Sequence, residues 1–360
     1  MSISTGPDQG LLIDQQGVGM NQPSNDSNIK KVKWGIIGTA NIARNAIVPA
    51  LQASPWCEIQ AVASRNIDKS KDFAAEFSIP VAYDSYDEIL DDPDIEAVYI
   101  PLPNHLHLEY ALKAAQKGKH VLCEKPITMN AKEAEQLRET PDGIIVAEAF
   151  MVRHHPQWHK LRQLIHSGQY GQVRNMQAMF SISLDKPDDF RFKPEFGGGA
   201  IYDLGCYTTV SARYVFEQEP ERVFCSVIRD PASQVDMTAN AILDFGNGRR
   251  ATFTVSMEMA ASQRLQVICE KALIDLPAPY VPGEQHPAEI WVSETGDLTE
   301  MLMRPVEVDQ VAQYENEVTN FSKAVRGEIT QEYAVEDAIR QMKVIDALFA
   351  SAATETWQSV

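Results

Sequence analysis

The sequence has little positive charge and no long apolar run. Its 32 lysine and arginine residues stand against 50 aspartate and glutamate residues, which gives a formal net charge of −18. Nucleic acids and anionic membrane surfaces attract basic patches, so this balance argues against both as partners. No apolar run reaches the length of a transmembrane helix. We therefore expect a protein that binds neither nucleic acid nor membrane.

Cysteine is also scarce, and its placement excludes the usual cysteine-based sites. The count is odd, and no Cys-x-x-Cys pair or Cys/His ligand spacing occurs. Free thiols in a reducing cytoplasm are the simplest explanation, so we expect a cytoplasmic protein. His154 and His155 are adjacent, but neighbouring residues of a helix or strand do not converge on one ion, and no third ligand follows at ligand spacing. No metal site is predicted. The five cysteines are Cys57, Cys123, Cys206, Cys225 and Cys269.

The length of 360 residues predicts about two domains, preceded by a polar segment. Residues 1–29 are rich in Gly, Asn, Gln and Ser and have neither a basic start nor a long apolar stretch, so they are not a secretory signal. We expect a flexible tail. The apolar cluster Leu11, Leu12 and Ile13 leaves open an arm that docks on a neighbouring subunit.

Residues 31–65 have the pattern of a strand, a tight turn, a helix and a second strand. Val32 to Ile37 form a short apolar run, which predicts a strand buried on both faces. Gly38 ends this run, residues 41–53 carry apolar side chains at helical spacing, and residues 59–63 form a second apolar run. In such a βαβ unit, the turn before the helix can bind a phosphate at the helix N-terminus.

The turn Gly38-Thr39-Ala40-Asn41-Ile42-Ala43 resembles the dinucleotide fingerprint G-x-G-x-x-G/A, with Ala40 at the second glycine position. The methyl group of Ala40 can push a pyrophosphate slightly outward. The second strand ends in Ser64-Arg65, where enzymes that use NAD usually carry Asp or Glu. A hydroxyl and a guanidinium suit a 2′-phosphate, so NADP is favoured over NAD. The alternatives are a tight turn without a ligand and an ordinary solvated Arg65.

Strand and helix patterns alternate up to residue 150, which predicts a doubly wound parallel sheet. Ligands of such sheets bind at the carboxyl ends of the strands, where Gly38, Ser64, the turn 101–104 and the turn 124–126 fall.

The pattern changes after residue 150. Period-two alternation predicts strands at 222–229, 240–245, 250–257, 264–269 and 272–276, with a hairpin at 246–248. We expect an α+β domain over 151–360 with a large open, mainly antiparallel sheet, after a dinucleotide-binding domain over 30–150. The predicted helices of this part are 159–167, 314–325 and 334–353.

Three segments combine residues that could carry chemistry. Glu124-Lys125-Pro126 directly follows a predicted buried strand, where a lysine would lie close to a cofactor; a solvated turn is the alternative. A second segment, EAFMVRHHP, lies at the domain junction. In the third, a triple glycine at 197–199 opens a helix on which Asp203 and Tyr207 share one face, a pair that is by itself more often structural than catalytic.

Together these segments resemble the glucose-fructose oxidoreductase / inositol dehydrogenase / MocA (Gfo/Idh/MocA) family, in the branch of NADP-dependent aldose (D-xylose) and trans-dihydrodiol dehydrogenases. The matching pieces are GIIGTANIA, AVASR, YIPLPNHLH, HVLCEKP, EAFMVRHHP and EFGGGAIYDLGCY. The resemblance implies an N-terminal Rossmann domain and a C-terminal α+β domain. Tyr207 stands where inositol dehydrogenases of the family have His, which points away from that branch.

The resemblance also implies roles for particular residues. Lys125 and Tyr207 would be catalytic, and Asp203 would help to position the substrate. Oxidation of an alcohol needs a base, and Tyr207 can serve if its pKa falls by ~3 units from about 10, with Lys125 and oxidised nicotinamide supplying the positive charge. The positions that match cofactor contacts are Gly38, Thr39, Ala40, Asn41, Ile42, Ser64, Arg65, Leu102, Asn104, His107, Glu124, Lys125 and Arg191.

We therefore predict an NADP(H)-dependent oxidoreductase of a sugar or related cyclic polyol. The alternatives are a trans-dihydrodiol dehydrogenase with the same site and a regulatory protein that senses NADP without turnover. By the habit of the family, and because Thr252, Thr254 and Ser256 give the predicted sheet a face of small side chains, we expect a homodimer or a dimer of dimers through the C-terminal sheet.

Overall fold

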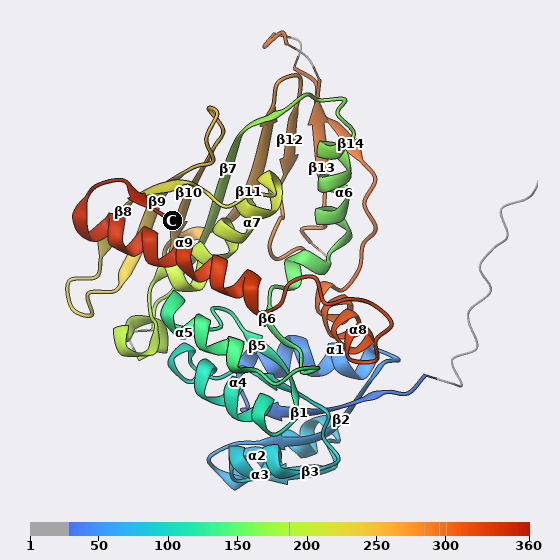
Figure 1. Cartoon of the computed structure of the whole chain (residues 1–360). Helices are drawn as coiled ribbons and strands as arrows, with labels where there is room; N and C mark the ends of the chain where they lie inside the picture. The colour runs from blue at the N-terminus through green and yellow to red at the C-terminus, as the bar shows by residue number, and fades with distance from the viewer. Residues whose placement is uncertain (1–28, 187, 284, 295, 300) are drawn as a thin grey trace, which may run out of the picture.

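The computed structural model describes residues 29–360 except residues 187, 284, 295 and 300 (Figure 1). The tail or arm predicted for residues 1–29 therefore lies almost entirely outside the described residues. Within them, no helix has both the length and the apolar character needed to cross a membrane.

The first half of the chain forms a six-stranded parallel sheet, as predicted. Its strand order is β3-β2-β1-β4-β5-β6. From β1 the chain adds strands first on one side and then, from β4 on, on the other, so the topological switch point lies between the carboxyl ends of β1 and β4. The strands are β1 (Val32–Ile37), β2 (Cys57–Ala63), β3 (Val81–Tyr83), β4 (Ala97–Ile100), β5 (His120–Glu124) and β6 (Val146–Ala149). The helices are α1 (Val48–Ala53), α2 (Ile67–Phe77), α3 (Tyr86–Asp91), α4 (His107–Gln116) and α5 (Ala131–Gln136).

Strand β1 explains why this half folds as a doubly wound sheet. Trp34 and Ile36 pack in the apolar core on one face of the sheet, and Ile37 packs in the core on the other face. Gly38 then turns the chain with a φ of 116°, and its N–H donates to the carbonyl of Ala63 at 2.8 Å. The predicted helix over 41–53 follows without a break and contains a π-helical turn, η2 (Ala43–Ile47).

The second half forms a nine-stranded sheet of order β14-β13-β12-β11-β7-β10-β9-β8-β15, in which only the β7–β10 pair is parallel. Helices α6 (Pro156–His166), α7 (Cys206–Phe216) and α9 (Val335–Thr354) cover one face (Figure 1). The strands are β7 (Val173–Ser183), β8 (Arg222–Arg229), β9 (Asp236–Asp244), β10 (Arg250–Ser256), β11 (Glu258–Cys269), β12 (Leu273–Leu276), β13 (Ile290–Ser293), β14 (Arg304–Val306) and β15 (Gln358–Ser359).

The hairpin between β9 and β10 is where it was predicted, with Gly246, Asn247 and Gly248 all at positive φ. Strand β7 was missed, although it lies between β10 and β11 in the middle of the sheet. Only Met176, Ala178 and Phe180 alternate cleanly in it, and the polar residues before them hide the period.

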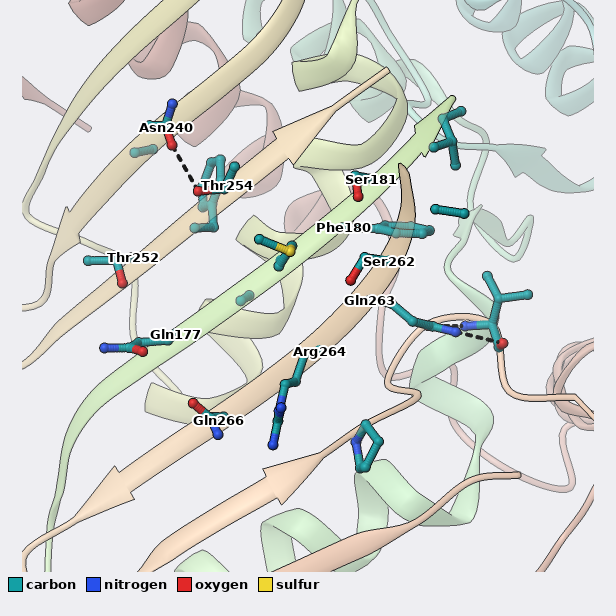
Figure 2. A pocket seen from close by; sticks show the side chains of 18 of the residues that line it. Gln177, Phe180, Ser181, Asn240, Thr252, Thr254, Ser262, Gln263, Arg264 and Gln266 are labelled. Carbon is teal, nitrogen blue, oxygen red and sulfur yellow. Dashed lines mark hydrogen bonds between the residues drawn. The ribbon is translucent and has the colours of Figure 1, made fainter. Parts of the chain in front are cut away.

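The other face of this sheet is open. Side chains of β7, β9, β10 and β11 stand on it, with the helices behind the strands, and they line a hollow of about 1440 Å³ (Figure 2). Thr252 and Thr254 belong to this face as expected. Ser256 follows on the same face by alternation but does not line the hollow, since it is fully buried and its hydroxyl lies 2.8 Å from that of Thr238.

Helix α8 (Gln313–Val325) returns to the first sheet, although its sequence follows the second one. Phe321 packs on Trp34 with ring centroids 5.3 Å apart, and the Trp34 indole N–H donates to Ser322 Oγ at 3.2 Å. Helix α8 also contacts α1 and the short helix η5 (Met151–His154) at the domain junction (Figure 1). The chain therefore crosses between the two sheets three times: after β6, before α8, and between α8 and α9.

Candidate active site

The structure brings the three predicted catalytic residues together across the domain junction. Lys125 directly follows β5, whereas Asp203 lies in the π-helical turn η8 (Ile201–Gly205) and Tyr207 in α7. The Lys125 ammonium donates to Asp203 Oδ1 at 2.9 Å and to the main-chain oxygen of Asp203 at 2.7 Å. It also lies 4.9 Å from the centroid of the Tyr207 ring.

Arg191 adds a second cation to this cluster. Its Nε donates to Asp203 Oδ2 at 2.7 Å, and its Nη1 donates to Asp189 Oδ1 at 3.3 Å. Each oxygen of the Asp203 carboxylate therefore faces one cation. Because Asp189 also contributes a carboxylate, two positive charges meet two negative ones, and the cluster carries no excess positive charge.

The pKa shifts of Asp203 and Lys125 both favour the charged form. Burial would raise the pKa of Asp203, but Lys125 and Arg191 hold it well below its usual range. Burial would lower the pKa of Lys125, yet Asp203 raises it above its ordinary value. A lysine and an aspartate that are both charged and both buried stabilise each other only as long as both are present.

Tyr207 is almost completely buried in an aromatic environment. Its ring lies edge-on to Phe150 and Phe180, with centroids 5.5 and 5.6 Å away, and 5.9 Å from Tyr280. Its hydroxyl donates to the sulfur of Met151 at 3.4 Å.

The charge state of Tyr207 differs from the sequence-based expectation. Burial raises the pKa of Tyr207 well above its ordinary value. Lys125, which was expected to lower this pKa, is paired with Asp203, and its ammonium lies over the ring, 4.9 Å from the centroid. In this structure the phenol is therefore a proton donor, as needed for reduction of a carbonyl.

A different steric constraint favours glycine at each of positions 197, 198 and 199. A Cβ at Gly197 would lie 2.9 Å from Asn104 Cβ, and one at Gly198 would lie 2.4 Å from the carbonyl oxygen of Arg191. At Gly199, where φ is 115°, a Cβ would lie 2.1 Å from Asp236 Oδ1. Asp236 is buried and accepts a hydrogen bond from Ile201 N–H at 2.6 Å. The glycines thus allow Asp236 to hold the start of the helical segment that carries Asp203 and Tyr207.

The expected phosphate-binding turn is open to a ligand. Thr39, Ala40 and Ile42 are half-buried, and Asn41 is exposed. Gly38 closes the turn against Leu102, since a Cβ there would lie 3.2 Å from Leu102 Cδ2. These residues fit a dinucleotide pyrophosphate, which the backbone amides of the turn would hold.

Ser64 and Arg65 lie at the end of β2, beside that turn in the sheet. Ser64 is buried, and its hydroxyl accepts from Asn66 N–H at 3.4 Å. Arg65 is exposed and close to Tyr86, and among the described residues it has no carboxylate partner. Its guanidinium is therefore available to a 2′-phosphate.

The remaining expected cofactor contacts are already engaged with protein groups. Asn104 donates to the carbonyl of Gly197 at 2.9 Å, and Glu124 Oε1 accepts from the hydroxyl of Tyr99 at 2.5 Å. His107 is fully buried, and its ring nitrogens lie 2.7 Å from the carbonyl oxygen of Pro126 and 2.6 Å from that of Leu102. Burial lowers the pKa of His107 to about 4. His107 therefore holds the two loops of the site in place, and a cofactor does not reach its ring.

The sequence did not point to three residues of the site. The Met151 sulfur accepts a hydrogen bond from the Tyr207 hydroxyl, and the Tyr99 hydroxyl donates to the Glu124 carboxylate. Asp236 accepts from the Ile201 N–H at the start of the helical segment that carries Asp203 and Tyr207. Each acts through a contact between distant segments, for which the sequence has no local signal. No group of three histidine, cysteine or carboxylate side chains within the described part of the chain could hold a metal, and its five cysteines are buried and unpaired.

A doubly wound sheet with an open βα turn, joined to a Lys-Asp-Tyr cluster, defines a nucleotide-dependent oxidoreductase. Residues 32–142 match the model of the oxidoreductase family with an NAD-binding Rossmann fold, and residues 158–275 match that of the GFO/IDH/MocA C-terminal domain. The chain belongs to the Gfo/Idh/MocA family, which confirms the resemblance seen in the sequence.

Three relatives show which branches are similar. A D-xylose 1-dehydrogenase (NADP(+)) from Haloferax volcanii is 34% identical over 89% of this chain and 97% of its own length. A trans-1,2-dihydrobenzene-1,2-diol dehydrogenase from Xenopus tropicalis is 32% identical over 68% of this chain and 75% of its own. The crystal structure of KijD10, a 3-ketoreductase from Actinomadura kijaniata, in complex with NADP and TDP-benzene, has a TM-score of 0.82 and 30% identity over 89% of this chain and 98% of that one.

Replacing Gly199 with alanine should destabilise the protein and lower its activity, because the new Cβ displaces the Asp236 carboxylate. A matched control is Gly248→Ala, since Gly248 also has a positive φ but has no atom within 4 Å of the Cβ position. We expect the control to cost about 1–2 kcal/mol of unfolding free energy from backbone strain. Gly199→Ala should cost ~1–3 kcal/mol more, the typical penalty for a broken buried hydrogen bond. Urea unfolding measures both, and equal losses would contradict this account of Gly199.

Proposed function

We propose that this protein is an NADP(H)-dependent oxidoreductase that interconverts a hydroxyl and a carbonyl group of a sugar or related cyclic polyol. The observation that carries the proposal is the joining of Lys125, Asp203 and Tyr207 at the carboxyl end of β5, next to an open dinucleotide turn. Bound NADPH would supply the hydride. Tyr207 would give its proton to the carbonyl oxygen as the hydride reaches the carbonyl carbon.

The raised pKa of Tyr207 suits the proton donation that carbonyl reduction requires. In oxidation Tyr207 must accept a proton, which requires a lower pKa. The positive charge of oxidised nicotinamide would favour that state, as any cation near a phenol does. The Lys125 ammonium would donate to the substrate oxygen as well as to the Asp203 carboxylate, and Asp203 would keep Lys125 charged.

The relatives support an inference about the substrate class. Xylose and a 1,2-dihydrodiol both carry hydroxyl groups on adjacent carbons. We infer that the substrate of this chain also carries oxygen on the carbon next to the reacting one. A trans-dihydrodiol dehydrogenase is a special case with the same residues. Turnover of NADPH with any carbonyl compound separates the enzyme from a regulatory protein that only senses NADP, and the intact Lys-Asp-Tyr cluster argues against the regulator.

Replacing Tyr207 with phenylalanine should lower kcat by ~10²–10⁴-fold, because it removes the proton carrier and keeps the ring packing. Lys125→Met should also lower turnover. Because the two residues act as a unit, the double variant should lose far less than the product of the single losses. Steady-state kinetics with the best of a panel of aldoses, keto-sugars and diols, followed by NADPH absorbance, measures these effects.

Fluorescence titration with NADPH is the control for this experiment. The Tyr207→Phe protein should bind NADPH as the wild type does, since the ring stays in its aromatic environment. Near-normal turnover of the Tyr207→Phe protein would show that another group carries the proton.

Arg65 should set the preference for NADP over NAD. Arg65→Ala should raise the Michaelis constant for NADP and leave that for NAD nearly unchanged, because only NADP has a 2′-phosphate for the guanidinium. Initial rates with each cofactor test this. An equal loss of affinity for the two cofactors would mean that Arg65 does not contact the phosphate.

The open face of the second sheet should be covered by a second copy of the chain, in a homodimer or a dimer of dimers. This face combines polar side chains with apolar ones such as Met179, which is 40% exposed, and a symmetric pair of such faces can pack together. Met179→Arg should shift the protein toward the monomer in sedimentation velocity at micromolar concentration. Ile329→Arg, at an exposed site after α8, should not. A wild-type protein that sediments only as a monomer would contradict the proposal.

A further inference from the structure

The first turn of helix α8 is fixed beside Tyr207 by two side chains. Gln313 Nε2 donates to the carbonyl of Tyr280 at 3.0 Å, and the Tyr280 ring is one of the rings that surround Tyr207. Asn316 Nδ2 donates to the carbonyl of His154 at 3.1 Å. His154 ends the short helix η5, which begins with Met151, the residue that accepts the Tyr207 hydroxyl. The turn is therefore held on both sides of the Tyr207 environment.

Tyr314 lies on this turn, between the two fixed residues, and belongs to the domain junction. It is half-buried and packs against the apolar core of the first sheet and that of the second. Tyr207 is a buried member of that second core, so both phenols lie at the domain junction. Tyr314 also adds to burial in raising the pKa of Tyr207.

The Tyr314 hydroxyl makes no hydrogen bond to protein within residues 29–360, leaving aside the four positions that the structure does not describe. Burial raises the pKa of Tyr314 above its ordinary value, with Glu124 and Glu317 acting in the same direction, so the phenol keeps its proton. Glu317 lies one helical turn away and is 1% exposed, too deep to reach a substrate. A neutral phenol both donates and accepts, so it can bind either a hydroxyl or a carbonyl oxygen.

We propose that Tyr314 is a second phenol of the active site, and that it binds the substrate oxygen next to the one on which Tyr207 acts. This inference rests on the proposed function and names the residue that binds the adjacent substrate oxygen. Each of the two adjacent substrate oxygens would bind one phenol. Tyr207 exchanges a proton with the reacting oxygen, and Tyr314 binds the neighbouring oxygen and so fixes the orientation of the substrate.

The test is the response of Tyr314→Phe to the presence of the adjacent oxygen. Two matched pairs of probes are D-glucose with 2-deoxy-D-glucose and trans-1,2-cyclohexanediol with cyclohexanol, each assayed with NADP. In whichever pair turns over, the variant should lose about 3- to 10-fold in kcat/KM with the compound that carries the adjacent hydroxyl, mainly through a higher KM. A loss of this size is what one neutral hydrogen bond usually contributes. With the analogue that lacks the neighbouring hydroxyl, its kcat/KM should equal that of the wild type.

Tyr333→Phe is the control, since it removes a phenol hydroxyl that accepts from Arg162 Nη1 at 3.3 Å, outside the Lys125, Asp203 and Tyr207 cluster, and should change neither rate. Circular dichroism and NADPH fluorescence titration should show that Tyr314→Phe is folded and binds NADPH normally.

Equal losses with both members of a pair, no loss with either, or a tenfold loss of NADPH affinity would each overturn the role of Tyr314. The failure of the proposed function looks different: wild-type protein that turns over none of the panel of sugars, diols and carbonyl compounds would overturn that function, and this inference with it.

Discussion

The ion pair between Lys125 and Asp203 is the contact on which the site depends. One partner follows the strand β5 of the first sheet, and the other begins the helical segment that packs under the second sheet. Both side chains are 12% exposed, so neither charge is well solvated by water. Removing one partner of such a pair leaves the other charge buried and typically costs ~3–5 kcal/mol. The pair therefore fixes the carboxyl edge of the nucleotide-binding sheet against the segment that carries Tyr207.

The same pair determines what Tyr207 can do. Because Asp203 and Asp189 balance Lys125 and Arg191, little positive charge remains to ionise the phenol, and burial keeps it protonated. A protonated phenol suits the delivery of a proton to a carbonyl oxygen. The direction of catalysis would then depend on the charge of the bound nicotinamide, since the charges of the protein itself are already compensated.

The fold was largely predictable, and the reasons lie in its periodicity. The first sheet consists of short apolar strands separated by amphipathic helices, so that Val32–Ile37 and its neighbours were found with small shifts at their ends. The hairpin at 246–248 was found from its glycines. Strand β7 was missed because its apolar alternation covers only part of its length, and the return of α8 to Trp34 depends on packing between segments almost 300 residues apart.

For the candidate site, the sequence pointed to residues that the structure brings together, but not to the electrostatics of their cluster. The resemblance to the family pointed to Lys125, Asp203 and Tyr207, which the structure places together. It could not predict that the ammonium lies over the Tyr207 ring, that His107 is enclosed between two carbonyl groups, or that Tyr314 of α8 reaches the junction. These features depend on burial and on the distances between segments, which no local pattern encodes.

The pH dependence of carbonyl reduction tests the central claim, a neutral Tyr207 beside a compensated ion pair, most directly. The acid form of Tyr207 is complete below its pKa and is lost as the pH rises through it. At saturating NADPH, kcat/KM for the carbonyl substrate should therefore stay level through neutral pH and fall only above about pH 10, the ordinary pKa of tyrosine. A fall centred near pH 7 that disappears in the Tyr207→Phe protein would contradict the account, because it would show a phenol whose pKa is lowered by uncompensated positive charge.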